Sequence, residues 1–237
     1  MDCLLLRLDA PLMSFGGVVV DQINPIERFP GRSMLAGLLA NALGWDHRDA
    51  ERIDALQARL KHAARWDVEP ERLVDYHTVD LSEDFLVDTG WTTRGYREDR
   101  KGGSAGELTH QRWRHYWANG IATVALTVTG EDAPTLADLE VALLQPARPL
   151  FIGRKTCLPA NPVLLGRREA ESLRAALCAE PLADPGPRPK PSRVSACWPI
   201  EEGEGREVRE VYDLRDWRNN LHRGSLRYAQ GFLEAAP

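Results

Sequence analysis

Apolar runs with two different periods alternate along the first 166 residues, and their order restricts the fold more than any other feature. Strand-like runs lie at residues 3–8, 64–68, 73–79, 121–129 and 162–165. The run IATVALTVT at 121–129 is the clearest, because it is long and rich in β-branched residues. The spacing of leucines predicts helices between Ser33 as N-cap and Gly44 as C-cap, at 49–60 and at 136–144.

The resulting order is strand, helix, strand, excursion, strand, helix, strand. This is the split βαβ or ferredoxin-like pattern, whose sheet also underlies RRM-type RNA binders. We therefore predict an α+β fold with a ferredoxin-like (RRM-like) body over residues 1–166, although such a fold does not by itself establish a function. Residues 80–120 are predicted to be an insertion. Residues 167–237 are predicted to be a C-terminal extension with a helix at 169–179, a proline-rich linker at 181–191 and short strand-like runs.

The chain as a whole lacks the positive charge that is typical of nucleic-acid-binding proteins. The net charge is −5 and the sequence pI is about 5.7, so a nucleic-acid surface would have to be a local patch. Only 4 of the 30 basic residues are lysine. Guanidinium groups suit contact with phosphates and bases, but the codons of a GC-rich genome produce the same bias.

The cysteines and the apolar runs indicate in which cellular compartment the protein works. The four cysteines, Cys3, Cys157, Cys178 and Cys197, form no CxxC pair and have no zinc-ligand spacing. The run at 3–8 is too short for a signal peptide and contains Arg7, and no stretch of about 20 apolar residues exists. We expect a cytoplasmic protein with reduced thiols, no membrane segment, and no metal or other cofactor.

Basic and aromatic residues interleave in GYREDRKGGSAGELTHQRWRHYW, the centre of the predicted insertion. Between Trp91 and Tyr116, six Arg or Lys residues stand against three Asp or Glu residues, a local excess of +3. Guanidinium groups neutralise phosphates and aromatic faces stack on unpaired bases. The pattern favours single-stranded RNA, but a solvated loop anchored by its aromatics would have the same composition.

Two further segments could bind phosphate. At the start of the first predicted helix, RFPGRS places Arg28, Arg32 and Ser33 where a helix presents unpaired N–H groups. In FIGRKTC, Gly153 permits close approach of the backbone to a ligand, beside Arg154 and Lys155. Ordinary helix capping and an ordinary surface turn explain these two segments equally well.

Catalytic signals are weak. His77 follows Tyr76, and His110 and His115 flank the basic aromatic segment, but no spacing forces two of these side chains together. The sequence contains no HExxH, DxD-type or GxSxG motif.

Several segments together resemble a known family. They are LLLRLDAPLMSFG, RFPGRSMLAGLLANALGW, DYHTV, YRED, LTHQRWRHYW and LFIGRKTCLPANPVLLG, which follow in order over about residues 3–166. The ordered set resembles the CasD subunits of type I-E Cascade, in the fifth family of CRISPR-associated proteins. The C-terminal segments VYDLRDW and RGSLRY fit this family only loosely.

The resemblance implies an RRM-like body with a β-hairpin thumb at about 80–120. In the family, body and thumb hold the 5′ handle of the CRISPR RNA within an antiviral surveillance complex. The implied partners are that RNA, a CasC-like backbone subunit and a CasA-like large subunit, with target DNA met only through the complex. The type I-E motifs imply an RNA-binding subunit without a catalytic site.

Carried onto this sequence, the resemblance implies a set of RNA-binding residues at the first turn, the helix start, the thumb and the late glycine turn. These are Ser14, Phe15, Gly16, Arg28, Arg32, Ser33, Arg97, Arg112, Trp113, Arg114, Arg154 and Lys155. The chain departs from the family at Phe15, where Trp is usual, and at Gly31, where Thr or Ser is frequent.

Two other hypotheses stay open. Related type I-C proteins cut precursor CRISPR RNA with Tyr, Lys and His side chains, so Tyr76, His77 and Lys155 could form a metal-independent endoribonuclease. Alternatively, the aromatic insertion could pack against a neighbouring protein and never contact RNA.

Overall fold

The computed structural model describes residues 1–18, 23–80, 90–91, 97–98 and 109–234. Its main element is a seven-stranded antiparallel sheet in the order β10-β1-β9-β4-β11-β13-β12. The strands are β1 (Asp2–Asp9), β4 (Leu60–Val68), β9 (Ile121–Val128), β10 (Leu164–Glu169), β11 (Arg193–Pro199), β12 (Glu207–Asp216) and β13 (Leu221–Glu234). The predicted mixed α+β class is confirmed.

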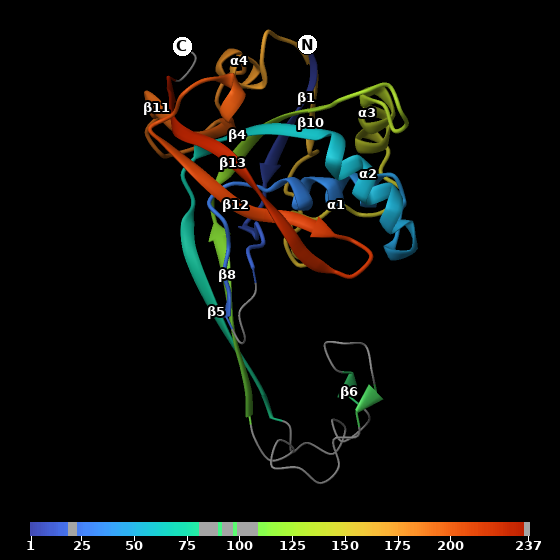
Figure 1. Ribbon diagram of the computed structural model, residues 1–237. Coiled ribbons are helices and arrows are strands. Elements are labelled where there is room, and N and C mark those ends of the chain that lie inside the picture. The colour runs from blue at the N-terminus through green and yellow to red at the C-terminus, as the bar shows by residue number, and fades with distance from the viewer. Residues whose placement is uncertain (19–22, 81–89, 92–96, 99–108, 235–237) are drawn as a thin grey trace.

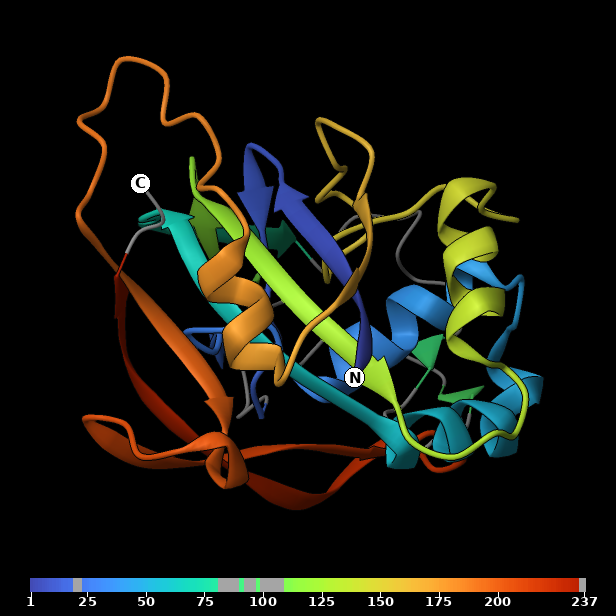
Figure 2. The same ribbon diagram turned by 90° about the horizontal axis from the view of Figure 1, so that it is seen from above.

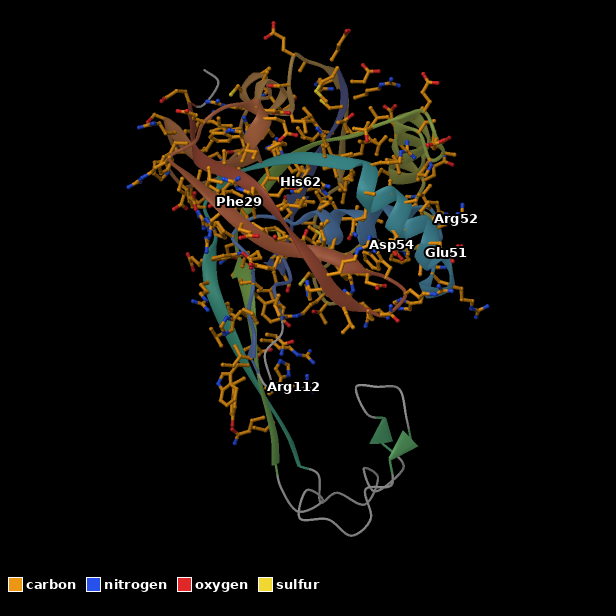
Figure 3. The ribbon with its side chains drawn as sticks, in the orientation of Figure 1. Phe29, Glu51, Arg52, Asp54, His62 and Arg112 are labelled. Carbon is orange, nitrogen blue, oxygen red and sulfur yellow. The ribbon has the colours of Figure 1, made fainter. Side chains whose placement is uncertain are left out.

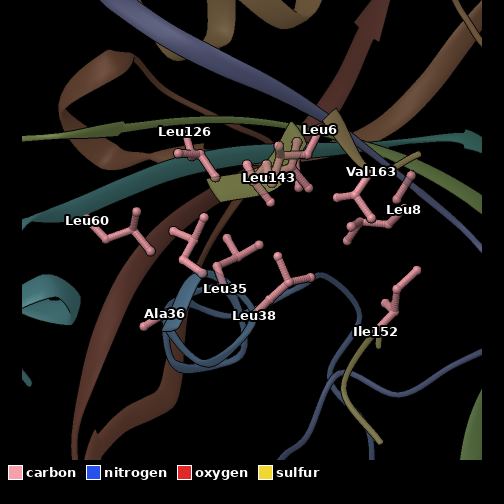
Figure 4. Close-up of a cluster of buried hydrophobic side chains, with 14 of the residues drawn as sticks. Leu6, Leu8, Leu35, Ala36, Leu38, Leu60, Leu126, Leu143, Ile152 and Val163 are labelled. Carbon is pink, nitrogen blue, oxygen red and sulfur yellow. The ribbon is translucent and has the colours of Figure 1, made fainter. Parts of the chain in front are cut away.

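Helices cover both faces of this sheet, which explains why β1 reads as a continuous apolar run. Helices α1 (Arg32–Ala42), α2 (Ala50–Arg59) and α3 (Leu136–Leu144) share one core with Leu4, Leu6 and Leu8 of β1 (Figure 4). On the opposite face, α4 (Leu173–Ala179) shares a smaller core with Cys3 and Leu5. In Figure 2, α4 crosses over the central strands, while the β12–β13 hairpin runs along one side of the body.

A second sheet extends from the body (Figure 1). Strands β5 (Glu71–Asp80) and β8 (Thr109–Ala118) pair antiparallel over their whole ten-residue length, and we call this pair the ladder. Strands β2 (Leu12–Met13) and β3 (Ile23–Asn24) also pair with β8. Two short strands, β6 (Gly90–Trp91) and β7 (Arg97–Glu98), pair with each other.

Several predicted boundaries move. The strand predicted at 73–79 begins at Glu71 and belongs to the second sheet, not the first. The helix predicted from Glu169 begins at Leu173, because residues 164–169 form β10. The predicted domain boundary at 166 therefore falls inside a strand. The C-terminal strands continue the main sheet, since Cys197 of β11 pairs with Ala64 of β4.

The N-cap prediction at Ser33 is wrong, because the helix begins at Arg32 and Gly31 occupies the cap position. At the other end the C-cap is Leu43, and Gly44 follows it with φ of +79°. Short 3₁₀ turns at His47–Asp49 and Ile200–Glu202 complete the helical elements of the described ranges. No helix in these ranges is long and apolar enough to cross a membrane.

Candidate nucleic-acid interface

The two faces of the ladder carry different chemistry. In an antiparallel pair, directly opposed residues point to the same face and neighbours along a strand point to opposite faces. His77 is opposite Arg112 and Asp75 is opposite Arg114, so these four side chains share one face, which we call the cationic face. The His77 Nε2 atom lies 2.6 Å from Asp75 Oδ2.

The opposite face of the ladder is aromatic. Tyr76 is opposite Trp113, and their ring centroids are 5.1 Å apart. Tyr76 is 50 % exposed, so this pair presents ring surface to solvent. The predicted contact run Arg112, Trp113 and Arg114 is therefore divided: the two arginines lie on the cationic face and the tryptophan on this aromatic face.

Arg154 extends the cationic face at the root of the ladder. Its guanidinium lies 4.6 Å from the ring centroid of Tyr116, which alternation places on the same face as Arg112 and Arg114. Nη1 of Arg154 donates a hydrogen bond of 2.8 Å to the His115 carbonyl, and Nη2 one of 3.5 Å to the Asn24 carbonyl. These bonds fix the guanidinium against β8 and β3 and leave its remaining N–H groups for a ligand. The adjacent Lys155 is exposed.

His115 lies on the aromatic face near this root. Burial lowers the pKa of His115, and the charges of Arg72 and Arg154 lower it further. Arg72 Nη2 is 2.7 Å from His115 Nδ1. A neutral His115 is the form that accepts this bond, so it adds no charge to the ladder at neutral pH.

The turn that carries Arg154 is held against the first turn of the chain. Gly153 has φ of +88°, and a Cβ there would lie 1.7 Å from the Ser14 carbonyl oxygen. The Ser14 N–H donates a 3.2 Å bond to the Ile152 carbonyl. The structure thus brings together the first turn, at Ser14, and the late glycine turn, at Gly153, which are far apart in the sequence.

The side chains of the first turn are not available to a ligand. Ser14 is 2 % exposed and Phe15 is 0 % exposed. The Phe15 ring packs 5.6 Å from the Trp66 ring, centroid to centroid, so Phe15 is a core residue rather than a groove-lining one. Of the predicted trio only Gly16 is exposed, and it forms an isolated β-bridge with Ile26.

Arg28 is committed to contacts within the protein. Its guanidinium lies 5.8, 5.8 and 5.5 Å from the ring centroids of Phe29, Trp66 and Trp117. It also pairs with Glu69 and donates a 3.1 Å bond to Ser195 Oγ. Because the loop before α1, strand β4, strand β8 and strand β11 all meet this one cation, its evident role is structural.

The start of α1, predicted to bind phosphate, is filled by a carboxylate of the chain itself. Asp213 of β12 accepts a 2.8 Å bond from the Ser33 N–H and a 2.5 Å bond from the Ser33 hydroxyl. Burial raises the pKa of Asp213, which is 2 % exposed. Ser33 therefore serves the packing of the C-terminal hairpin. Sequence reasoning missed Asp213, whose only signal was its place in VYDLRDW.

The buried His62, labelled in Figure 3, lies on β4. Arg32, the other predicted residue at the start of α1, is close enough for its charge to act on His62. That charge lowers the pKa of His62 and also acts to lower that of the Tyr228 hydroxyl, whose pKa burial raises. Arg32 is thus part of the same internal polar cluster. The side chain of Arg97 lies outside the described residues, although its backbone belongs to β7.

The geometry separates two of the three residues of the nuclease hypothesis. Tyr76 and His77 are neighbours on β5 and point to opposite faces of the ladder. In the described part of the chain, no three His, Cys, Asp or Glu side chains gather as metal ligands.

Comparison with known proteins places this geometry in a family. The model of a family described as CRISPR-associated protein (Cas_Cas5) matches residues 3–229. The chain belongs to this Cas5 family. The CRISPR system Cascade subunit CasD of Escherichia coli K12 is 34 % identical over 182 residues, covering 73 % of this chain and 75 % of that protein.

Solved structures of similar proteins cover almost the whole Cas5 chain. One is described as a CRISPR RNA-guided surveillance complex, with a TM-score of 0.70, 26 % identity, and coverage of 98 % of this chain and 90 % of that one. Another, described as a crystal structure of a Cas protein, has a TM-score of 0.65, 25 % identity, and coverage of 98 % and 95 %. The likeness therefore extends to the C-terminal strands, beyond the segments that the sequence motifs identified.

Proposed function

We propose that this Cas5-family chain is an RNA-binding subunit of a type I-E Cascade that holds the 5′ handle of the CRISPR RNA in antiviral defence. One observation carries the proposal: Arg112, Arg114 and Arg154 share one face of the ladder and its root, with the exposed Lys155 beside them. An extended strand presents successive cations on one face about 7 Å apart, close to the spacing of phosphates along an extended single strand.

The aromatic face suits a different contact. Tyr76 and Trp113 can stack on unpaired bases or pack on a neighbouring subunit. By analogy with the Cascade subunit CasD, we propose a CasC-like backbone subunit and a CasA-like large subunit as neighbours, with target DNA met through the complex. Because the whole chain has a net charge of −5, we expect the RNA to contact the cationic face and not the surface of the chain in general.

We also propose that β10, β1, β9 and β4 form a ferredoxin-like (RRM-like) core. Their spatial order is that of the ferredoxin pattern, all neighbours are antiparallel, and helices lie between β1 and β4 and between β9 and β10. The ladder then takes the place of the thumb, inserted between β4 and β9.

The decisive experiment is binding of the full chain to a labelled RNA that carries the repeat-derived handle. The Arg112→Ala, Arg114→Ala variant is expected to bind at least about tenfold more weakly at low salt, and its slope of log K against log salt falls by about 1.4. Arg48→Ala, Arg218→Ala is the charge-matched control, because both arginines are exposed and remote from the ladder. Equal losses in the two variants would refute the assignment.

The same RNA separates the two other hypotheses. We propose that the chain is not an enzyme, so it should leave the labelled repeat RNA intact in EDTA. Specific cleavage there would instead support the endoribonuclease. For a protein-only scaffold, ultraviolet crosslinking of an assembled complex would give no adduct between the ladder and RNA.

A further inference from the structure

The cationic face of the ladder contains a carboxylate among its arginines. Asp75 of β5 is directly opposite Arg114 and diagonal to Arg112, which is labelled in Figure 3. The Asp75 side chain is 48 % exposed. A carboxylate in this position repels the phosphates that the arginines attract, so on its own it weakens the binding of any nucleic acid.

Asp75 does not act as the cross-strand partner of Arg114. Directly opposed acidic and basic side chains on one face of a sheet commonly pair with each other. Here the Asp75 Oδ2 atom instead lies 2.6 Å from Nε2 of His77, which is on the same strand, and no ion pair joins Asp75 to an arginine of the described residues. The contact with His77 holds the carboxylate over β5, whereas the row of arginines lies over β8.

These two rows match two adjoining parts of a nucleotide. Phosphates bound by Arg112 and Arg114 would follow β8, and the side chains of β5 lie about 5 Å across the ladder from that row. Each ribose is bonded directly to its phosphates and therefore lies within reach of β5. An ionised carboxylate only accepts hydrogen bonds, and the 2′-hydroxyl is the donor that an internal ribose offers. An internal deoxyribose has no such donor.

We propose that Asp75 accepts a hydrogen bond from a ribose 2′-hydroxyl of the bound RNA, so that the ladder selects RNA over DNA. The inference rests on the proposed function, because it takes the handle RNA as the ligand of the cationic face. The arginines attract the phosphates of either nucleic acid and Asp75 repels both, but only RNA has the hydroxyl that offsets this repulsion. His77 is a positioning residue, which holds the carboxylate in place.

The test measures binding of the full chain to labelled handle RNAs in which one ribose at a time is replaced by deoxyribose. In the original chain, one such replacement is expected to weaken binding at least about fivefold, because a hydrogen bond to a charged acceptor is lost. In Asp75→Ala the same replacement should change binding less than about twofold, because the acceptor is already absent. This coupling between the two changes identifies the contact.

Glu71→Ala is the matched control. Glu71 is an exposed carboxylate on the same strand and the same face, but it is opposite Ala118 and not an arginine. Its removal changes the net charge equally and should leave the deoxyribose penalty of the original chain intact. His77→Ala should reduce that penalty, and His77→Gln, whose amide can donate to the carboxylate, should retain most of it.

Four results would contradict the inference. Equal deoxyribose penalties in the original chain and in Asp75→Ala at every position overturn it. Coupling of Asp75→Ala to the loss of a base amino group, as from guanine to hypoxanthine, instead of to any deoxyribose shows that the carboxylate reads a base. Cleavage of the RNA that Asp75→Ala abolishes shows that Asp75 and His77 are catalytic. Failure to bind the unmodified handle refutes the proposed function together with this inference, whereas binding without coupling refutes this inference alone.

Discussion

His62 is a titratable side chain in the interior of the described part of the protein. It is 1 % exposed and lies on β4 beneath the C-terminal hairpin. Burial lowers the pKa of His62 to about 3, and the charge of Arg32 acts in the same direction. The neutral ring donates from Nε2 to the Pro30 carbonyl at 2.9 Å and accepts at Nδ1 from the Tyr228 hydroxyl at 3.2 Å.

This depressed pKa predicts a loss of stability in mild acid. The unfolded chain binds a proton at His62 below about pH 6.5 and the folded chain does not until about pH 3, so the free energy of unfolding falls as pH falls through this window. Between pH 6.5 and 4.5 the contribution is about 2–3 kcal/mol. His62→Gln, whose amide can also donate and accept, should remove that part of the dependence in urea unfolding at the two pH values.

The exposed His47→Gln is the matched control for this experiment. It should keep the pH dependence of the original chain. The assignment of a neutral His62 is wrong if His62→Gln and the original chain lose the same free energy of unfolding on acidification. His62 would then be protonated in the folded state as it is in the unfolded state.

At the scale of elements, the late glycine turn at residues 149–157 determines where Arg154 lies. Gly153→Ala would place a methyl group 1.7 Å from the Ser14 carbonyl oxygen in a left-handed conformation, φ of +88°. We expect a loss of at least about 2 kcal/mol in the free energy of unfolding, together with weaker RNA binding because Arg154 moves away from β8.

Gly186→Ala is the matched control, because Gly186 also has positive φ, +62°, but a Cβ there would meet nothing within 4 Å. It should cost only about 1 kcal/mol from the backbone conformation. Chemical unfolding of both variants separates the two contributions, and equal costs would mean that contact with Ser14 is unimportant.

The elements themselves can be predicted where the signal is local. The predicted bounds of α3 are the observed ones, and those of β9 agree within one residue, because the spacing of leucines and the run of β-branched residues are local patterns. The two faces of the ladder could not be assigned, because the sequence pattern predicts an insertion and not a strand at residues 109–118. Which β5 residues share each face depends in addition on the register between β5 and β8. The run RWR therefore reads as one contact surface.

Long-range contacts also account for the candidate site residues that the sequence misplaced. Ser33 and Asp213 are 180 residues apart, so no local pattern reveals their bond. A Cβ at position 31 would lie 2.3 Å from the Asp213 carboxyl carbon, so the observed position of Asp213 requires glycine at this cap. The burial of Phe15 and the internal contacts of Arg28 are hidden in the sequence because their partners, Trp66 and Trp117, come from distant strands.

At the scale of the whole molecule, the C-terminal strands are part of the main sheet. β11 pairs with β4, and Trp198 and Leu233 bury the α4 face together with residues of β1. A chain ending at residue 192 would expose β4 as an edge and uncover that core. We expect it to be insoluble or to lack a cooperative thermal transition by circular dichroism, unlike the full chain.

The predicted division into a body at 1–166 and an extension leads to the opposite expectation for this truncation. A soluble 1–192 fragment with a sharp thermal transition would support that division and show that β11–β13 are dispensable for folding. The measurement therefore decides between one cooperative unit and a body with an appendage.

The bond between Ser33 and Asp213 has a consequence for how the protein is made. On the ribosome, α1 emerges long before its capping carboxylate is synthesised, and β4 before its neighbour β11. The nascent chain must hold these groups in water until β11 and β12 leave the exit tunnel. Capping of α1 is thereby deferred until every element between α1 and β12 has been synthesised.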